Sequence, residues 1–167
     1  METIQIPSTF LTSIKDKYLL LDTNLFRDAA VRPSVFNEFF NRLKSSGVSL
    51  ITIDLVKYEL LKGSSDLEKY KAKEKLINDV VDSIIPMIPQ IYSNVHGLIK
   101  EYGIEGTAVN ITDLFLGAML MQYKPNIFLI TRDTTDFIQR IFDLSSIINV
   151  PHAKGIFTYG IYQYKGI

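Results

Sequence analysis

Short apolar runs alternate along the chain with longer stretches that have helical periodicity. Residues 18–21 form a continuous apolar run, which is typical of a buried parallel strand. Residues 48–53 are β-branched and half-alternating, and residues 127–130 are again wholly apolar, so we expect a strand at each. Residues 156–164 are aromatic and predict a late or edge strand. The pattern therefore predicts four strands.

The stretches between these strands predict helices. Gly63 ends one of them, Ser65 and Glu68 have the spacing of a capping box for the next, and Asn110 or Thr112 is placed to cap the last. We expect helices at residues 35–43, 55–62, 65–85, 90–102 and 113–123.

Strands that alternate with helices predict an α/β fold, a three-layer α/β/α sandwich with a mainly parallel central sheet. The 167 residues are 47% apolar, which is enough for one hydrophobic core. We expect one domain over residues 1–167, with an N-terminal extension at 1–16 and a helical excursion at 64–106.

The amino-acid composition excludes several kinds of chemical site. The chain has no cysteine, which excludes disulfides, thiolate metal sites and cysteine nucleophiles. It shows no basic leader and no apolar run of the roughly 18 residues that span a bilayer, so we expect a cytoplasmic protein that does not enter a membrane. The formal net charge is zero, so the charge balance does not by itself indicate a polyanionic partner.

Four acidic residues lie where predicted strands end or predicted helices begin: Asp22, Glu59, Asp113 and Asp133. The carboxyl ends of parallel strands meet at one edge of a sheet, so we expect these four carboxylates to converge. Carboxylates that converge repel one another, and a divalent cation makes their proximity tolerable at neutral pH. Oxygen ligands favour Mg²⁺ or Mn²⁺.

Four motifs in order resemble those of the PIN-domain ribonucleases, including the VapC-type toxins of toxin-antitoxin pairs. They are LLDTNL at residues 20–25, YELLKG at 58–63, TDLFLGA at 112–118 and LITRDTTDF at 129–137. Their order and spacing agree with the family over residues 18–150. The resemblance implies a PIN-like version of the α/β sandwich.

The resemblance also implies roles for individual residues. The implied catalytic acids are Asp22, Glu59, Asp113 and Asp133. The implied Mg²⁺ or Mn²⁺ ligands are Asp22, Asp113, Asp133 and Asp136. Asp136 is the alternative to Asp133 as the fourth acid of the cluster. Asn24 and Thr131 would support the acids, and Glu59 would orient the attacking water or accept its proton.

Four cationic residues lie within a few positions of the acidic motifs and are candidates for contact with RNA: Arg27, Lys57, Lys62 and Arg132. Together with the resemblance, the pattern predicts a metal-dependent endoribonuclease. The protein would be the toxin of a toxin-antitoxin pair, with an antitoxin protein as partner, and would form a homo-oligomer.

Other interpretations stay open at this point. Taken singly, Asp22 fits a helix cap, Asp113 a helix N-terminus, Glu59 an ion pair with a nearby lysine, and Asp133 a turn. A catalytically silent PIN-fold domain that binds RNA or protein is the alternative function. A phosphatase with Asp22 as nucleophile is disfavoured, because Asn24 occupies the position where that class has a second aspartate.

Two further features have an interpretation from sequence. Gly117 lies one turn after Asp113 and indicates either tight packing or close approach of a ligand to the backbone, of which packing is favoured. The aromatic residues Phe157, Tyr159 and Tyr162 predict that the tail covers the core or pairs across an interface, with the first role favoured.

Overall fold

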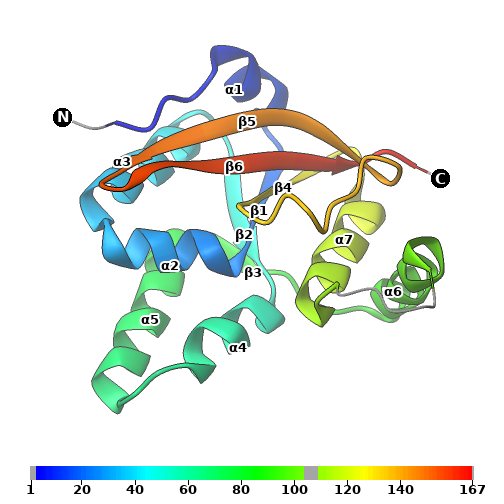
Figure 1. Cartoon of the computed structure of the whole chain (residues 1–167), viewed down its shortest axis with the longest axis horizontal. Coiled ribbons are helices and arrows are strands. Elements are labelled where there is room, and N and C mark those ends of the chain that lie inside the picture. The colour runs from blue at the N-terminus through cyan, green and yellow to red at the C-terminus, as the bar shows by residue number, and fades with distance from the viewer. Residues whose placement is uncertain (1–2, 104–108, 167) are drawn as a thin grey trace.

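The computed structural model describes residues 3–103 and 109–166, which form seven helices and six strands (Figure 1). The strands are β1 (Tyr18–Leu21), β2 (Ser49–Thr52), β3 (Ser83–Ile84), β4 (Ile127–Thr131), β5 (Phe142–His152) and β6 (Gly155–Tyr164). The helices are α1 (Ser8–Ile14), α2 (Thr23–Val31), α3 (Pro33–Ser45), α4 (Asp54–Lys62), α5 (Leu67–Val80), α6 (Pro89–Tyr102) and α7 (Ile111–Tyr123).

The six strands form one mixed sheet in the order β3-β2-β1-β4-β6-β5. β1 is parallel to both of its neighbours, with Leu20 opposite Ile51 of β2 and opposite Leu129 of β4. β3 extends this parallel set, whereas β6 is antiparallel to β4 and forms a hairpin with β5. The predicted α/β class and the parallel central strands are confirmed.

The order of the strands reverses between β1 and β4. From β1 the chain adds β2 and then β3 toward one edge of the sheet, and it then returns to add β4 on the other side of β1. Figure 1 shows α2, α3 and α5 on one side of the central strands and α6 and α7 on the other. Open α/β sheets bind ligands outside the carboxyl ends of the strands at such a reversal.

The apolar pattern explains which elements fill the core. Leu19, Leu20 and Leu21 of β1 are fully buried, as expected for a strand that has a neighbour on each edge and helices on both faces. In α7 every residue from Leu114 to Leu120 is buried, so this helix is apolar all round. β1, β4 and α7 therefore give the candidate acids a rigid base.

One predicted helix cap is wrong, and one of the two caps predicted for α7 is confirmed. Asp66, and not the Ser65 and Glu68 pair, caps α5, because its carboxylate accepts the Lys69 N–H at 2.8 Å. Asn110 caps α7 through a 2.9 Å bond from the Thr112 N–H, so this helix begins two residues before Asp113.

The segment at 64–106 is not wholly helical, because α5 ends at Val80 and the two-residue strand β3 follows. The predicted end of this segment at residue 106 lies outside the described residues. The tail is a late strand but not an edge strand, since β6 lies between β4 and β5. Tyr159 and Tyr162 are buried, so the tail completes the core of its own chain.

The N-terminal extension contributes to the same core through Ile4, Phe10 and Ile14, which are buried. Within the described ranges, no helix has the length and apolar character needed to cross a membrane.

Candidate metal centre

A cavity of about 540 Å³ opens beyond the carboxyl ends of the parallel strands. Its lining includes all four acids that the sequence predicts to converge. The cavity is lined by Asp22, Thr23, Asn24, Arg27, Glu59, Lys62, Gly63, Asn110, Asp113 and Asp133.

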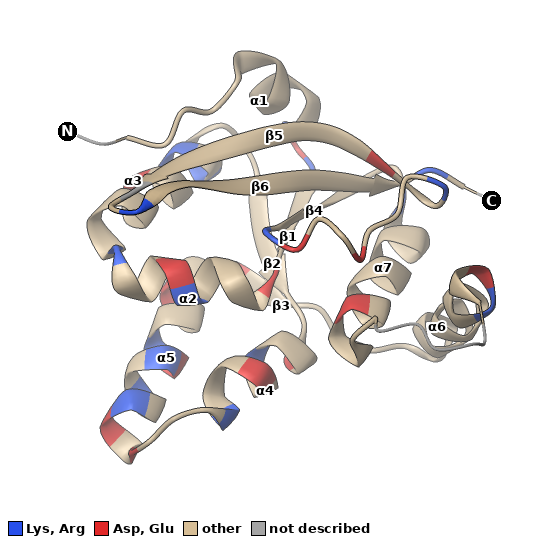
Figure 2. Cartoon of the chain, viewed as in Figure 1, with Lys and Arg blue, Asp and Glu red and all other residues tan. Residues whose placement is uncertain are grey.

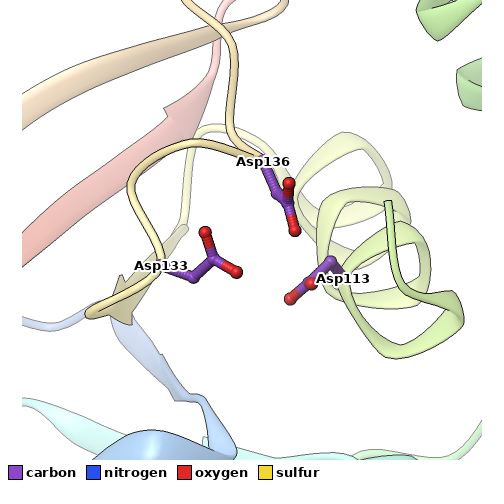
Figure 3. A group of neighbouring side chains, drawn as sticks. All are labelled: Asp113, Asp133 and Asp136. Carbon is purple, nitrogen blue, oxygen red and sulfur yellow. The ribbon is translucent and has the colours of Figure 1, made fainter. Parts of the chain in front are cut away.

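Two of the cavity acids, Asp113 and Asp133, form a close group with Asp136, which is not among the lining residues. Asp113, Asp133 and Asp136 each offer an oxygen atom, and these atoms lie within 4.8 Å of one another. Figure 3 shows the three side chains pointing toward one another, Asp113 from α7 and the other two from the loop after β4. Oxygens from several carboxylates are the ligands that Mg²⁺ and Mn²⁺ prefer, so this group fits such a cation.

The loop that contributes two of these acids is held by local bonds. The Asp133 carboxylate accepts the Thr135 N–H at 3.3 Å and the Thr135 hydroxyl at 3.0 Å. The Tyr102 hydroxyl at the end of α6 donates to the Asp136 carbonyl. The bond from the Thr135 N–H closes a side-chain turn at Asp133, which was one of the two roles predicted for this residue. The Asp133 carboxylate also points toward Asp113.

Burial and mutual repulsion raise the pKa values of two carboxyl groups in this cluster, Asp113 and Asp136. Burial, with the charge of Asp22 and a hydrogen bond to Asp136 as further causes, raises the pKa of Asp113 to about 8. Burial is also the main reason why the pKa of Asp136 is raised. Carboxyl groups with raised pKa values are stabilised in their charged form by a nearby cation, which agrees with a metal centre.

Asp22 lines the same cavity but is outside the group of three. It caps α2, and its Oδ1 accepts the Thr23 N–H at 2.6 Å. Its Oδ2 accepts the Asn24 amide at 2.9 Å and the Thr131 hydroxyl at 2.7 Å. Desolvation is the largest cause of its raised pKa, since the side chain is buried. Asn24 and Thr131 thus contact Asp22 directly.

Glu59, in the second turn of α4, is held by three donors. Its Oε2 accepts the Thr23 hydroxyl at 2.6 Å, and its Oε1 accepts the Thr112 hydroxyl at 2.9 Å and the Asn110 amide at 3.3 Å. These partners come from α2 and from the start of α7. The alternative role predicted for Glu59 was an ion pair with a nearby lysine, and these three donors take the place of that lysine.

Two of the four cationic candidates for RNA contact line the cavity, and two do not. Arg27 and Lys62 line the cavity, and both are exposed. Lys57 is not among the lining residues. Arg132 instead lies 3.5 Å from Asp28 and 4.4 Å from the centroid of the Phe157 ring.

Figure 2 shows how charge is distributed around the site. Acidic positions lie in the loop after β4 and at the start of α7, whereas α5 carries positive and negative positions side by side. The formal net charge of zero thus conceals a local concentration of carboxylates.

Sequence reasoning missed the site contacts of three polar residues: Thr23, Asn110 and Thr112. Thr23 and Thr112 each directly follow or precede a predicted acid, and that adjacency was the only available signal. Gly117 is not part of the cavity lining. A Cβ there would lie 2.9 Å from Phe142 and 3.0 Å from Leu98, so this glycine serves close packing of α7.

Comparisons of the chain with protein-family models, with curated proteins and with solved structures find no match. The geometry of the site is therefore the basis for any functional assignment.

Proposed function

We propose that this protein is a Mg²⁺- or Mn²⁺-dependent endoribonuclease with a PIN-like fold. The observation that carries the proposal is the group formed by Asp113, Asp133 and Asp136, whose oxygens lie within 4.8 Å of one another beside a cavity at the reversal of the strand order. The sequence motifs that resemble the PIN-domain ribonucleases support the same function.

The three aspartates would hold the cation, and Asp22 and Glu59 complete the acidic wall of the cavity. A bound divalent cation supplies charge neutralisation at the phosphate and makes water more acidic. Arg27 and Lys62 line the same cavity and would bind the RNA phosphates on either side of the bond that is cut. The cavity is open to solvent through these exposed residues, which suits a polymeric substrate.

Single-stranded or looped RNA is the substrate class that we propose, because the backbone must enter the cavity far enough for a phosphate to reach the carboxylates. The toxin role, an antitoxin partner and a homo-oligomer stay predictions of the sequence resemblance.

The proposal is tested by incubating the protein with a mixed RNA pool, with and without Mn²⁺, and sequencing the fragment ends. We expect internal cuts only when Mn²⁺ is present, and none with Asp113→Asn. Asp143→Asn is the matched control, because Asp143 is exposed on β5 and does not line the cavity. RNA that is retained by the protein but never cut would support the RNA-binding alternative and overturn the nuclease.

A further inference from the structure

Three elements that are distant in sequence meet at the Glu59 carboxylate. Thr23 is the first residue of α2, Thr112 belongs to the first turn of α7, and Glu59 lies on α4. Both threonines are buried, and each hydroxyl donates to a different oxygen of Glu59, at 2.6 Å for Thr23 and 2.9 Å for Thr112.

The two threonines are direct neighbours of acids at the cavity. Thr23 follows Asp22, and Thr112 precedes Asp113. Asn110 adds a second link, because its Oδ1 caps α7 while its Nδ2 donates to Glu59 Oε1 at 3.3 Å. Glu59 therefore joins the helix starts that present Asp22 and Asp113.

The Glu59 carboxylate keeps one hydrogen-bond acceptor site that none of its three donors occupies. An ionised carboxylate has about four lone-pair sites, two on each oxygen. Thr112 and Asn110 occupy both sites on Oε1, and Thr23 occupies one on Oε2. One site on Oε2 is left, and Glu59 lines the cavity. A single remaining site is suited to one water molecule.

We infer that Thr23 and Thr112 are positioning residues that hold Glu59 out of the cation's coordination and direct its remaining lone pair at the attacking water. This inference rests on the proposed nuclease function and extends it. Glu59 is absent from the group of three acids whose oxygens lie within 4.8 Å, which agrees with a role apart from metal binding. Loss of either hydroxyl lowers the rate of cleavage while leaving cation affinity nearly unchanged.

The test uses Thr112→Val, which keeps the shape of the side chain and removes the hydroxyl, and Thr112→Ser, which restores the hydroxyl. Thr52→Val is the matched control, because Thr52 is equally buried and its hydroxyl donates to the Leu21 carbonyl instead of to Glu59. Glu59→Gln tests metal binding, and Glu59→Leu with the double variant Glu59→Leu and Thr112→Val completes a cycle, because leucine removes both acceptor oxygens. For each protein we would measure Mn²⁺ affinity, the midpoint of urea unfolding and the rate of RNA cleavage.

We expect Thr112→Val to cut about tenfold more slowly than the wild type per folded molecule, since a misplacement of ~1 Å can cost about a hundredfold and Glu59 keeps two of its three donors. Thr112→Ser recovers the rate, and Thr52→Val keeps it. The double variant is no slower and no less stable than Glu59→Leu alone, because the hydroxyl acts through that carboxylate. Mn²⁺ affinity changes less than threefold in Thr112→Val and Glu59→Gln.

Two results overturn the inference. One is a fall in Mn²⁺ affinity with Glu59→Gln as large as that with Asp113→Asn, which would make Glu59 a ligand. The other is additive losses of stability and rate in the double variant. If the wild type cuts no RNA, the nuclease proposal fails, whereas the Mn²⁺ affinities and the unfolding cycle still decide whether the two threonines act through Glu59. Thr23→Val gives the same readouts if Thr112→Val does not fold.

Discussion

The Thr131 hydroxyl at the end of β4 donates a 2.7 Å hydrogen bond to Asp22 Oδ2, across 109 positions of sequence. The same oxygen of Thr131 accepts the Asp133 N–H at 3.0 Å. One buried hydroxyl therefore connects the acid after β1 with the start of the loop that presents Asp133 and Asp136. This link fixes two of the predicted motifs relative to each other.

Thr131→Val should destabilise the protein by about 1–3 kcal/mol, because it removes a donor from a buried carboxyl group and an acceptor from the Asp133 N–H. Urea unfolding of the metal-free protein measures this loss. A change below about 0.5 kcal/mol would show that the connection between Asp22 and the loop contributes little to the fold.

The stability of the metal-free protein should fall as the pH rises from about 4 to about 8. In the unfolded chain Asp113 has its ordinary pKa of 3.8, whereas in the folded protein burial raises the pKa to about 8. Between these values the folded state binds more protons than the unfolded state, so raising the pH favours unfolding. Unfolding midpoints measured at several pH values without metal test this slope.

Asp113→Asn provides the control, because it removes the titrating group and should flatten the pH dependence. Mn²⁺ should restore the stability lost at high pH, since it binds the ionised carboxylates of the folded state. A metal-free stability that rises steadily from pH 5 to pH 8 in the wild type would contradict the buried position of Asp113.

The strands at the centre of the sheet were predictable because local sequence determines them. Residues 18–21 and 127–130 are wholly apolar, and each is followed by polar residues that end the strand. β3 has only two residues and no periodicity, so it was assigned to the preceding helix. β5 was not predicted, because its register with β6 shifts between Leu144 and Ser146 and the shift interrupts the alternation that marks a strand.

At the candidate site, too, the residues marked by local sequence were predictable, whereas the contacts made by tertiary packing were not. Asp22 and Asp113 were recognisable because Asp22 directly follows β1 and Asp113 lies in the first turn of α7. The inclusion of Asp136 with Asp113 and Asp133 depends on the course of the loop after β4, which residue spacing does not determine. The threonines that hold Glu59 are brought to it by the packing of three helices, so their adjacency to Asp22 and Asp113 in the sequence does not reveal the contact with Glu59.

Gly117→Ala should destabilise the protein without changing Mn²⁺ affinity. The added methyl group would meet Phe142 and Leu98 at 2.9 and 3.0 Å. Overpacking of this kind costs about 1–3 kcal/mol, which exceeds the roughly 1 kcal/mol that alanine gains over glycine in a helix. Gly97→Ala in α6 is the matched control and should stabilise, because no atom lies within 4 Å of its added Cβ. Equal effects at both positions would contradict the close packing of α7.

Arg27→Ala and Lys62→Ala should each weaken RNA binding and reduce the dependence of the logarithm of affinity on the logarithm of salt concentration by about 1. Lys57→Ala should leave both quantities unchanged, because Lys57 does not line the cavity. Binding to a catalytically inactive Asp113→Asn background at several salt concentrations measures these effects. A loss with Lys57→Ala equal to that with Lys62→Ala would place the RNA path elsewhere.

Arg132→Ala should reduce stability more than RNA affinity. Its guanidinium group lies 3.5 Å from Asp28, whose side chain is buried and also accepts a hydrogen bond from the Tyr159 hydroxyl. Removing the cation leaves a buried carboxylate without its opposite charge, which is costly. Thermal unfolding and RNA binding of the same variant separate the two effects. A loss of RNA affinity at unchanged stability would show that Arg132 binds RNA.

The proposed metal centre requires that Asp113, Asp133 and Asp136 together hold a divalent cation. Calorimetric titration of Mn²⁺ into the wild type, Asp113→Asn, Asp136→Asn and Asp143→Asn at pH 7.5 tests it most directly. We predict that the wild type and Asp143→Asn bind Mn²⁺ equally, and that Asp113→Asn and Asp136→Asn each bind at least about tenfold more weakly, a loss of about 1.4 kcal/mol. Equal Mn²⁺ affinity in all four proteins would contradict the claim.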